Sequence, residues 1–141
     1  MIEAKDIVAH AIGMVGTRWH HHGRQPGIGL DCAGLCFCSA WGAGASLPDF
    51  LGYGPDPDPV AVRQAMVERL DEIPADDATA GCVLLVKSNP GIRGQHTGVL
   101  IDTGEWVHAN NEVGRVVRQP FTAAMTRRLL VAAFRFRGVK Y

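Results

Sequence analysis

Residues 95–110 read QHTGVLIDTGEWVHAN, and this stretch decides the class of fold. The segments 96–101 and 105–109 are rich in β-branched, aliphatic and aromatic residues, and turn-forming residues separate them at 102–104. The pattern predicts two neighbouring antiparallel strands joined by a short turn. Because alternate side chains of a strand share a face, such a hairpin would bring His96 and His108 to the same face of the sheet.

Further strands are predicted on both sides of this hairpin. The aliphatic run 82–86 is bounded by Gly81 and by the turn signal at 89–91. The segments 115–118 and 129–136 have the same strand-like composition. We expect residues 71–81, which are mostly polar, to form a linker before the first of these strands.

In the first half of the chain, the sequence pattern predicts helices. Apolar residues between Ile7 and Val15 recur as on one helical face. A second helix is expected to begin at Cys32, with Asp31 near the N-cap, and to run towards Trp41. A third follows Pro59, with apolar residues at positions 62, 66 and 70. Helices followed by antiparallel strands indicate an α+β fold.

Length and composition limit the classes of protein. A chain of 141 residues, 47% of them hydrophobic, is expected to form a single domain over 1–141. Lys and Arg (14) balance Asp and Glu (14), which argues against a nucleic-acid partner, since phosphate binding needs excess cations. No apolar run is long enough to span a membrane. The acids in residues 1–6 predict no secretory signal, and hence synthesis in the cytoplasm.

Cys32 is the strongest candidate for chemistry among the four cysteines. Backbone N–H groups at a helix start favour the thiolate and can also bind an oxyanion. Gly34 is expected to allow close packing where this helix meets the sheet. Cys36, Cys38 and Cys82 are interpreted as structural, and no disulfide framework is expected in a reducing compartment.

His96 and His108 supply the partners that a catalytic thiol needs. A nucleophilic cysteine requires a general base and a second residue that orients the base. A lone histidine in a strand is more often a hydrogen-bonded core residue. Two histidines in one hairpin, with a helix-start cysteine upstream, favour catalysis.

These residues resemble the motifs of one family, the NlpC/P60 cysteine peptidases. Residues 31–35 (DCAGL) resemble the nucleophile motif, 96–101 (HTGVLI) the histidine strand, and 107–109 (VHA) the segment that follows it. Residues 81–86 (GCVLLV) are similar to the strand before the histidine. The stretch 16–24 (GTRWHHHGR) resembles the variant found in members from phage tails and gene transfer agents.

The resemblance implies a papain-like NlpC/P60 fold, with N-terminal helices packed on an antiparallel β-sheet. It implies hydrolysis of an amide bond in bacterial peptidoglycan stem peptides, between D-γ-glutamyl and a diamino acid. Cys32 would be the nucleophile, His96 the general base and His108 the residue that orients His96. The chemistry requires no cofactor and no metal, and tail proteins would be the partners of a tail-associated member.

The sequence departs from the family pattern near the nucleophile. Trp19 stands where the family usually has a tyrosine whose hydroxyl helps to bind the oxyanion, and an indole offers only an N–H donor. One of the histidines at 20–22 is an alternative donor. Trp19, His21, Asp31 and Arg24 are therefore the candidates for oxyanion or substrate binding, and residues 49–53 are a candidate wall of the substrate groove.

Two other functions remain open. The chain could be a structural or assembly component of a phage-like tail that has kept the fold and lost most activity. It could also be an amidase or acyltransferase on the same scaffold, because acyl transfer to water or to an amine uses the same residues.

Overall fold

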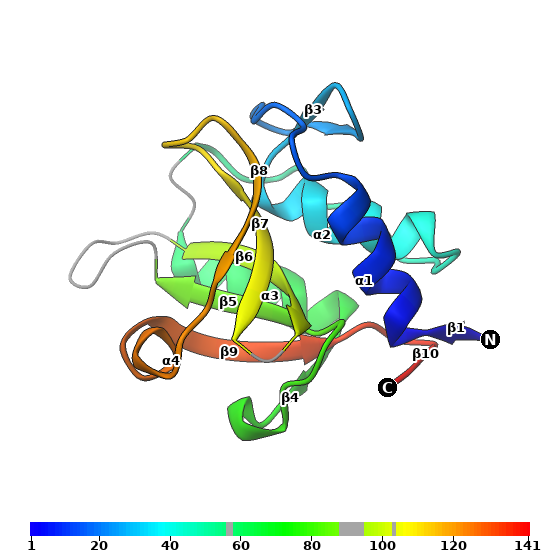
Figure 1. Cartoon of the computed structure of the whole chain (residues 1–141), viewed down its shortest axis with the longest axis vertical. Coiled ribbons are helices and arrows are strands. Elements are labelled where there is room, and N and C mark those ends of the chain that lie inside the picture. The colour runs from blue at the N-terminus through cyan, green and yellow to red at the C-terminus, as the bar shows by residue number, and fades with distance from the viewer. Residues whose placement is uncertain (56–57, 88–94, 103) are drawn as a thin grey trace.

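Two N-terminal helices, α1 and α2, lie against a sheet formed by the second half of the chain (Figure 1). The computed structural model describes residues 1–55, 58–87, 95–102 and 104–141. Its elements, in chain order, are β1 (Ile2–Glu3), α1 (Ala4–Gly13), β2 (Arg24–Gln25), β3 (Gly29–Leu30), α2 (Cys32–Gly42), α3 (Pro59–Arg69), β4 (Asp71–Ile73), the 3₁₀ helix η1 (Ala75–Asp77), β5 (Val83–Lys87), β6 (Gln95–Asp102), β7 (Glu105–Asn110), β8 (Arg115–Pro120), α4 (Ala123–Leu129), β9 (Leu130–Arg135) and β10 (Val139–Lys140).

The main sheet has the strand order β4-β9-β5-β6-β7-β8, and all its neighbouring strands are antiparallel. The predicted hairpin is confirmed as β6 and β7, with Val99 opposite Val107. The predicted turns involve residues 89–91 and 103, which lie outside the described residues. The two ends of the chain meet where β1 pairs in parallel with β10 (Figure 1).

The structure adds three features that the sequence pattern does not predict. The expected linker 71–81 contains β4 and η1, and β4 pairs with β9 at the edge of the sheet. Residues 123–129 form α4, capped by the Thr122 hydroxyl, which accepts a hydrogen bond from the Met125 N–H. Strand β9 lies between β4 and β5, so the strands do not follow chain order. The pairings of β9 with β4 and β5 join segments that are distant in the sequence, so no short stretch of sequence indicates them.

The helical expectations are confirmed with small shifts. Helix α1 ends at Gly13, and Gly16 follows it with a φ of 95°. Helix α3 begins at Pro59, where Asp58 is the N-cap and accepts a hydrogen bond from the Val60 N–H. No helix within the described part of the chain is both long and apolar enough to cross a membrane.

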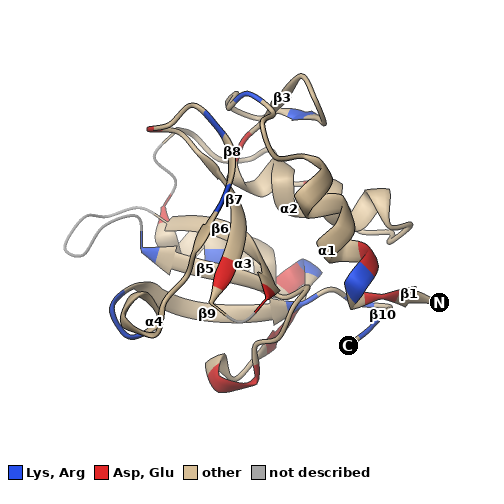
Figure 2. Ribbon diagram, in the orientation of Figure 1, with Lys and Arg blue, Asp and Glu red and all other residues tan. Residues whose placement is uncertain are grey.

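The sheet is covered on both faces. One cluster packs Ile7, Ala11 and Leu35 of α1 and α2 against buried strand residues such as Val99 and Phe134. A second, smaller cluster consists of other strand side chains, among them Leu84, Trp106 and Ala133. Met125 and Leu129 of α4 pack against it. Helix α2 carries no charged residue (Figure 2), as is typical of a helix buried on most of its surface.

Gly98 allows the hairpin to hold a large ring. Val99 pairs with Val107, so Gly98 lies opposite His108 and next to Trp106. A Cβ on Gly98 would lie 2.4 Å from Trp106 Cε3 and 2.8 Å from the Val107 carbonyl oxygen. Trp106 can therefore cover this part of β6 only because residue 98 has no side chain.

Replacing Gly98 with alanine should destabilise the protein by about 1–3 kcal/mol, the usual cost of overpacking a core. The Cβ meets a ring edge and a backbone oxygen, and neither can move away freely. Urea unfolding followed by tryptophan fluorescence measures the change. The matched control is Gly13→Ala, whose Cβ meets nothing within 4 Å and which should stabilise α1 by up to about 1 kcal/mol. A Gly98→Ala protein as stable as the wild type would contradict this account.

Candidate active site

Asp31 starts the helix that carries the candidate nucleophile. Its backbone is extended, and one carboxylate oxygen accepts a hydrogen bond of 2.8 Å from the Gly34 N–H. This is the N-cap that the sequence predicts, and it makes Cys32 the first residue of α2. Asp31 is only 2% exposed, so its charge must be satisfied by neighbouring groups.

Position 34 must be a glycine because another segment packs closely against it, but that segment is the preceding loop and not the sheet. A Cβ at Gly34 would lie 2.0 Å from the Gly23 carbonyl oxygen and 3.1 Å from Arg24 Nη1. The helix therefore touches the preceding loop here, and the expectation that Gly34 faces the sheet is wrong. Gly23 is itself confined, since its Cβ would lie 2.5 Å from the backbone of Gly29.

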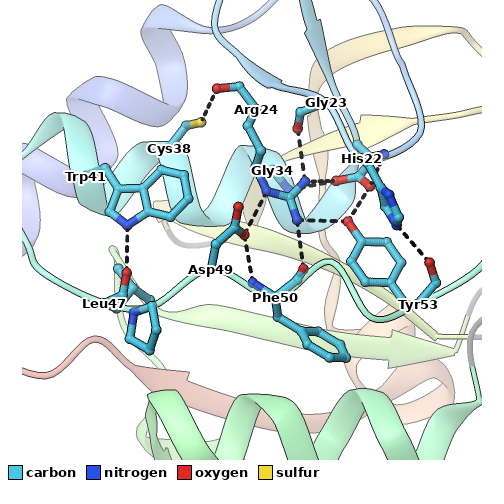
Figure 3. Close-up of polar contacts among 12 residues, drawn as sticks. His22, Gly23, Arg24, Gly34, Cys38, Trp41, Leu47, Asp49, Phe50 and Tyr53 are labelled. Atoms are coloured by element: carbon cyan, nitrogen blue, oxygen red, sulfur yellow. Dashed lines mark hydrogen bonds and ion pairs between the residues drawn. The ribbon is translucent and has the colours of Figure 1, made fainter.

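Arg24 joins three separate segments through all five of its N–H groups (Figure 3). Nη1 donates to Asp31 at 2.9 Å and to the Gly23 carbonyl at 3.0 Å. Nε donates to Asp49 at 3.0 Å, and Nη2 donates to the Phe50 carbonyl and to the Tyr53 hydroxyl. With every donor used, Arg24 holds the loop, the helix start and the segment after α2 together, and has none left for a substrate.

Tyr53 completes the set of groups around Asp31. Its hydroxyl donates to Asp31. It also accepts a hydrogen bond from Arg24 (Figure 3). Burial and the hydrogen bond to Asp31 raise the pKa of Tyr53, so the phenol stays protonated. The His22 N–H donates at 2.9 Å to Oδ2 of the carboxylate, the oxygen that also accepts from Tyr53. Asp31 therefore accepts four hydrogen bonds, which occupies its lone pairs and leaves it a structural anion.

On the sheet, the two predicted histidines are hydrogen-bonded to each other. His96 Nε2 and His108 Nδ1 lie 2.7 Å apart, as the same-face expectation requires. The second nitrogen of His108, Nε2, lies 2.7 Å from Gln119 Oε1 on β8. Trp106 stacks on His108 with ring centroids 4.3 Å apart and meets His96 edge-on at 5.7 Å. The ring of His96, near the start of β6, is thus held by contact with buried Trp106 and by the hydrogen bonds that link it through His108 to Gln119.

Cys32 and His96 line one cavity of about 300 Å³ between α2, α3 and the sheet. Phe37, Phe50 and Met66 contribute to its mostly apolar wall. No Lys or Arg is among the described residues that line it. The cavity therefore suits a largely uncharged group with an amide or ester placed at the thiol. The full set of lining residues is Trp19, His21, Asp31, Cys32, Ala33, Cys36, Phe37, Phe50, Tyr53, Gly54, Pro55, Val62, Ala65, Met66, Leu70, Val83, Gln95, His96, Thr97, Ala109 and Asn111.

The thiol and the imidazole are both neutral in this arrangement. Burial, and then the charge of Asp31, raise the pKa of Cys32, and burial outweighs the opposing polar groups of Thr97 and the Ala33 backbone. Burial, with a smaller effect of His108, lowers the pKa of His96 to about 3. The Ala33 backbone at the helix start does lower the pKa of Cys32, as expected, but the effect of burial is larger. The desolvation of a thiol at the bottom of the cavity is larger than the effect of the helix amides.

The other predicted residues separate into cavity walls and supports. Trp19 and His21 line the cavity, as do Phe50 and Tyr53 of the candidate groove segment, whereas Arg24 supports that segment from behind. Within the histidine triplet, His21 is the member that reaches the cavity. His22, at a φ of 60°, contacts the Tyr53 carbonyl through Nε2, and His20 contacts the His21 carbonyl. Across the described residues, no cluster of three metal-ligating side chains occurs.

The remaining cysteines are free thiols in the interior. Cys36, Cys38 and Cys82 are at most 6% exposed, while Cys32 is half-buried. Cys36 also reaches the cavity wall, one helical turn after Cys32.

Sequence reasoning missed the roles of Tyr53 and Gln119. Tyr53 lies in a Pro- and Gly-rich connection, and its contact with Asp31 spans 22 positions. Gln119 has one usable signal, its place directly after the predicted strand 115–118, which follows the histidine hairpin in the sequence. Strand register, which brings Trp106 opposite Gln119, appears only in the folded sheet.

Comparison with known proteins connects this geometry to one group. A family model described as "NlpC/P60 family" matches residues 16–135. No curated protein sequence matches the chain. A Staphylococcus aureus structure described as similar to a lipoprotein of the NLP/P60 family has 21% identity and a TM-score of 0.66, over 94% of this chain and 41% of that one. The chain thus spans less than half of that protein.

Two further structures have the same fold. The peptidoglycan hydrolase RipB from Mycobacterium tuberculosis has 19% identity and a TM-score of 0.68, over 98% of this chain and 65% of that one. The NlpC/p60 domain of the peptidoglycan hydrolase SagA has 22% identity and a TM-score of 0.67, over 94% of this chain and 98% of that one. The expected papain-like α+β fold is confirmed by these likenesses.

Iodoacetamide should alkylate Cys32 before the three buried cysteines, at a rate that still rises at about pH 9, above the ordinary pKa of a free thiol. The reason is the raised pKa of Cys32, which keeps the thiolate scarce at neutral pH. Mass spectrometry of labelled peptides over a pH series measures the rate, with glutathione as the reference thiol. A plateau in the rate near neutral pH would show a resting thiolate and contradict the neutral pair.

Replacing Arg24 with methionine should lower the free energy of unfolding by about 3 kcal/mol, since it leaves the buried Asp31 charge without its cation. Thermal and urea unfolding measure the loss. Arg63→Met is the matched control, because the Arg63–Glu72 ion pair is exposed and should contribute less than about 1 kcal/mol. Equal effects of the two changes would contradict the role assigned to Arg24.

Proposed function

The chain belongs to the NlpC/P60 family, and from this premise we propose that it is a thiol peptidase that hydrolyses an amide bond in bacterial peptidoglycan stem peptides. The observation that carries the proposal is the shared cavity of Cys32 and His96, with His108 hydrogen-bonded at 2.7 Å behind His96. The same fold in the peptidoglycan hydrolases RipB and SagA supports the choice of substrate.

The proposed reaction begins from the neutral pair. As Cys32 Sγ attacks the carbonyl carbon, its proton passes to His96 Nδ1, the nitrogen that does not face His108. The carbonyl oxygen becomes an oxyanion. The N–H groups of Cys32 and Ala33 are the proposed donors to it, because the first-turn amides of a helix lack internal acceptors and Asp31 occupies that of Gly34.

Collapse of this intermediate breaks the C–N bond, and the His96 proton passes to the leaving amine. A thioester to Cys32 remains. Water then attacks the thioester carbonyl while His96 takes one of its protons. The C–S bond breaks, the free carboxylic acid leaves, and the proton returns to Cys32. His108 holds the His96 ring through both steps.

The proposed bond lies between D-γ-glutamyl and the diamino acid of the stem peptide, as in the family that the motifs resemble. The apolar cavity wall made by α3 and by Phe50 would hold the uncharged part of the peptide. Trp19 and His21, on the wall of the same cavity, are the proposed polar contacts in place of the family's usual tyrosine.

The test is digestion of purified muropeptides followed by mass spectrometry. Wild-type protein should release fragments cut within the stem peptide, Cys32→Ala should release none, and His96→Ala should be slower by about 10³-fold, the usual contribution of a general base. Cys82→Ala, which removes a buried thiol away from the cavity, should keep its activity. The same fragments from Cys32→Ala as from the wild type would exclude the mechanism.

A second candidate is a component of a phage-like tail, supported by the stretch 16–24 and its Trp19. In that case we propose that the protein is made in the cytoplasm and reaches the cell wall with the tail particle. A wild-type protein that is folded by circular dichroism but cuts no muropeptide favours an inert tail component. An amidase or acyltransferase is distinguished by adding an amine acceptor, since acyl transfer gives a new amide of higher mass than the hydrolysed product.

A further inference from the structure

Gln119 lies at the end of a polar chain that leads to the proposed base. Its Oε1 is 2.7 Å from His108 Nε2, and His108 Nδ1 is 2.7 Å from His96 Nε2. We propose that Gln119 is a positioning residue that sets which nitrogen of each imidazole carries the proton, and so leaves His96 Nδ1 unprotonated and ready to accept the thiol proton. This inference rests on the proposed function.

Strand register brings the amide to this position. Trp106 pairs with Gln119 and His108 pairs with Val117, so Gln119 is a diagonal neighbour of His108 on the same face of the sheet. The contact joins two strands of a continuous antiparallel ladder in which all six residue pairs of β7 and β8 are in register. The side chain therefore reaches His108 from a rigid position.

The proton order follows from the donor and acceptor capacity of each group. A neutral imidazole has one N–H donor and one acceptor nitrogen. A carbonyl oxygen only accepts, so the Gln119 oxygen requires the proton of His108 on Nε2. His108 Nδ1 must then accept, and His96 Nε2 must donate to it. His96 is left with a free lone pair on Nδ1.

The opposite orientation of the amide would reverse the whole chain. If the Gln119 NH₂ group faced His108, Nε2 would accept and Nδ1 would donate to His96 Nε2. The single proton of a neutral His96 would then occupy Nδ1 and block transfer from Cys32. Gln119 thus acts on a nitrogen two hydrogen bonds away, without any contact with the substrate.

The surroundings make both rings depend on these bonds. His108 is 6% exposed and stacked on Trp106, so water has little access to exchange its tautomers. Burial lowers the pKa of both histidines, so both rings are uncharged at neutral pH. Each ring then carries one proton, on either Nδ1 or Nε2. A residue that only filled space at position 119 would leave this order undetermined.

The experiment reads the protons directly, by long-range ¹H–¹⁵N correlation spectra of the histidine rings of the full chain. The pH is about 8.5, some two units above the ordinary pKa of histidine. In the wild type both His96 and His108 should give the pattern of Nε2–H tautomers. Gln119→Met keeps the side-chain length but offers only a weak acceptor, and should give mixed tautomers at both rings.

Two further variants isolate the acceptor from the packing. Gln119→Glu keeps an oxygen acceptor and should retain the wild-type tautomers at this pH. Arg118→Met changes the preceding residue of β8, whose side chain lies on the opposite face of the sheet and pairs with exposed Glu105. This control should alter the tautomer of neither ring. In the hydrolysis assay Gln119→Met should lower kcat by about 10-fold or more, with little change in KM, and Gln119→Glu should restore most of it.

An Nδ1–H pattern at His96 in the wild type would overturn the inference, as would unchanged tautomers in Gln119→Met. A loss of kcat in Gln119→Glu equal to that in Gln119→Met, with wild-type tautomers, would also overturn it. The spectra require no substrate. The predicted tautomers in a wild-type protein that cuts no muropeptide would therefore count against the proposed function and support the proton order.

Discussion

The buried carboxylate of Asp31 is the interaction on which the site depends. An anion that is 2% exposed is costly, and it is tolerated here because four hydrogen bonds and the Arg24 charge surround it. Those bonds come from the helix start, from the loop at 22–24 and from Tyr53 in the connection after α2. The same carboxylate thus caps the helix that begins at Cys32 and holds Tyr53, a residue of the cavity wall, in place.

The opposite side of the cavity is organised by the sheet. Gly98 leaves room for Trp106, which packs on both histidines, and the β7–β8 register brings Gln119 to the last ring nitrogen. The helical half thus contributes a thiol with a raised pKa, and the sheet contributes an imidazole with a lowered one. Burial of the group is the largest cause of both shifts, and both keep the resting groups uncharged.

Much of the framework could be predicted from short stretches of sequence. The strand-like composition and the turn residues of 95–110 identified the hairpin, Asp31 identified the start of α2, and Pro59 that of α3. Strand β4 was missed because three residues at a sheet edge are too few for a pattern. Helix α4 was missed because it has only seven residues, and the last of them fell within the predicted strand 129–136. The prediction that Gly34 packs against the sheet was wrong, because a glycine in a helix does not indicate which segment approaches it.

The sequence by itself determined the two halves of the fold, the first residue of the nucleophile helix and the shared face of the two histidines. These depend on caps, turns and strand alternation, which act over a few residues. The tertiary structure decided the use of Arg24, the contact of Tyr53 with Asp31, the place of Gln119 and the direction of the Cys32 pKa shift. Burial and contacts between distant segments set these properties, and both exist only once helix and sheet have closed around the cavity.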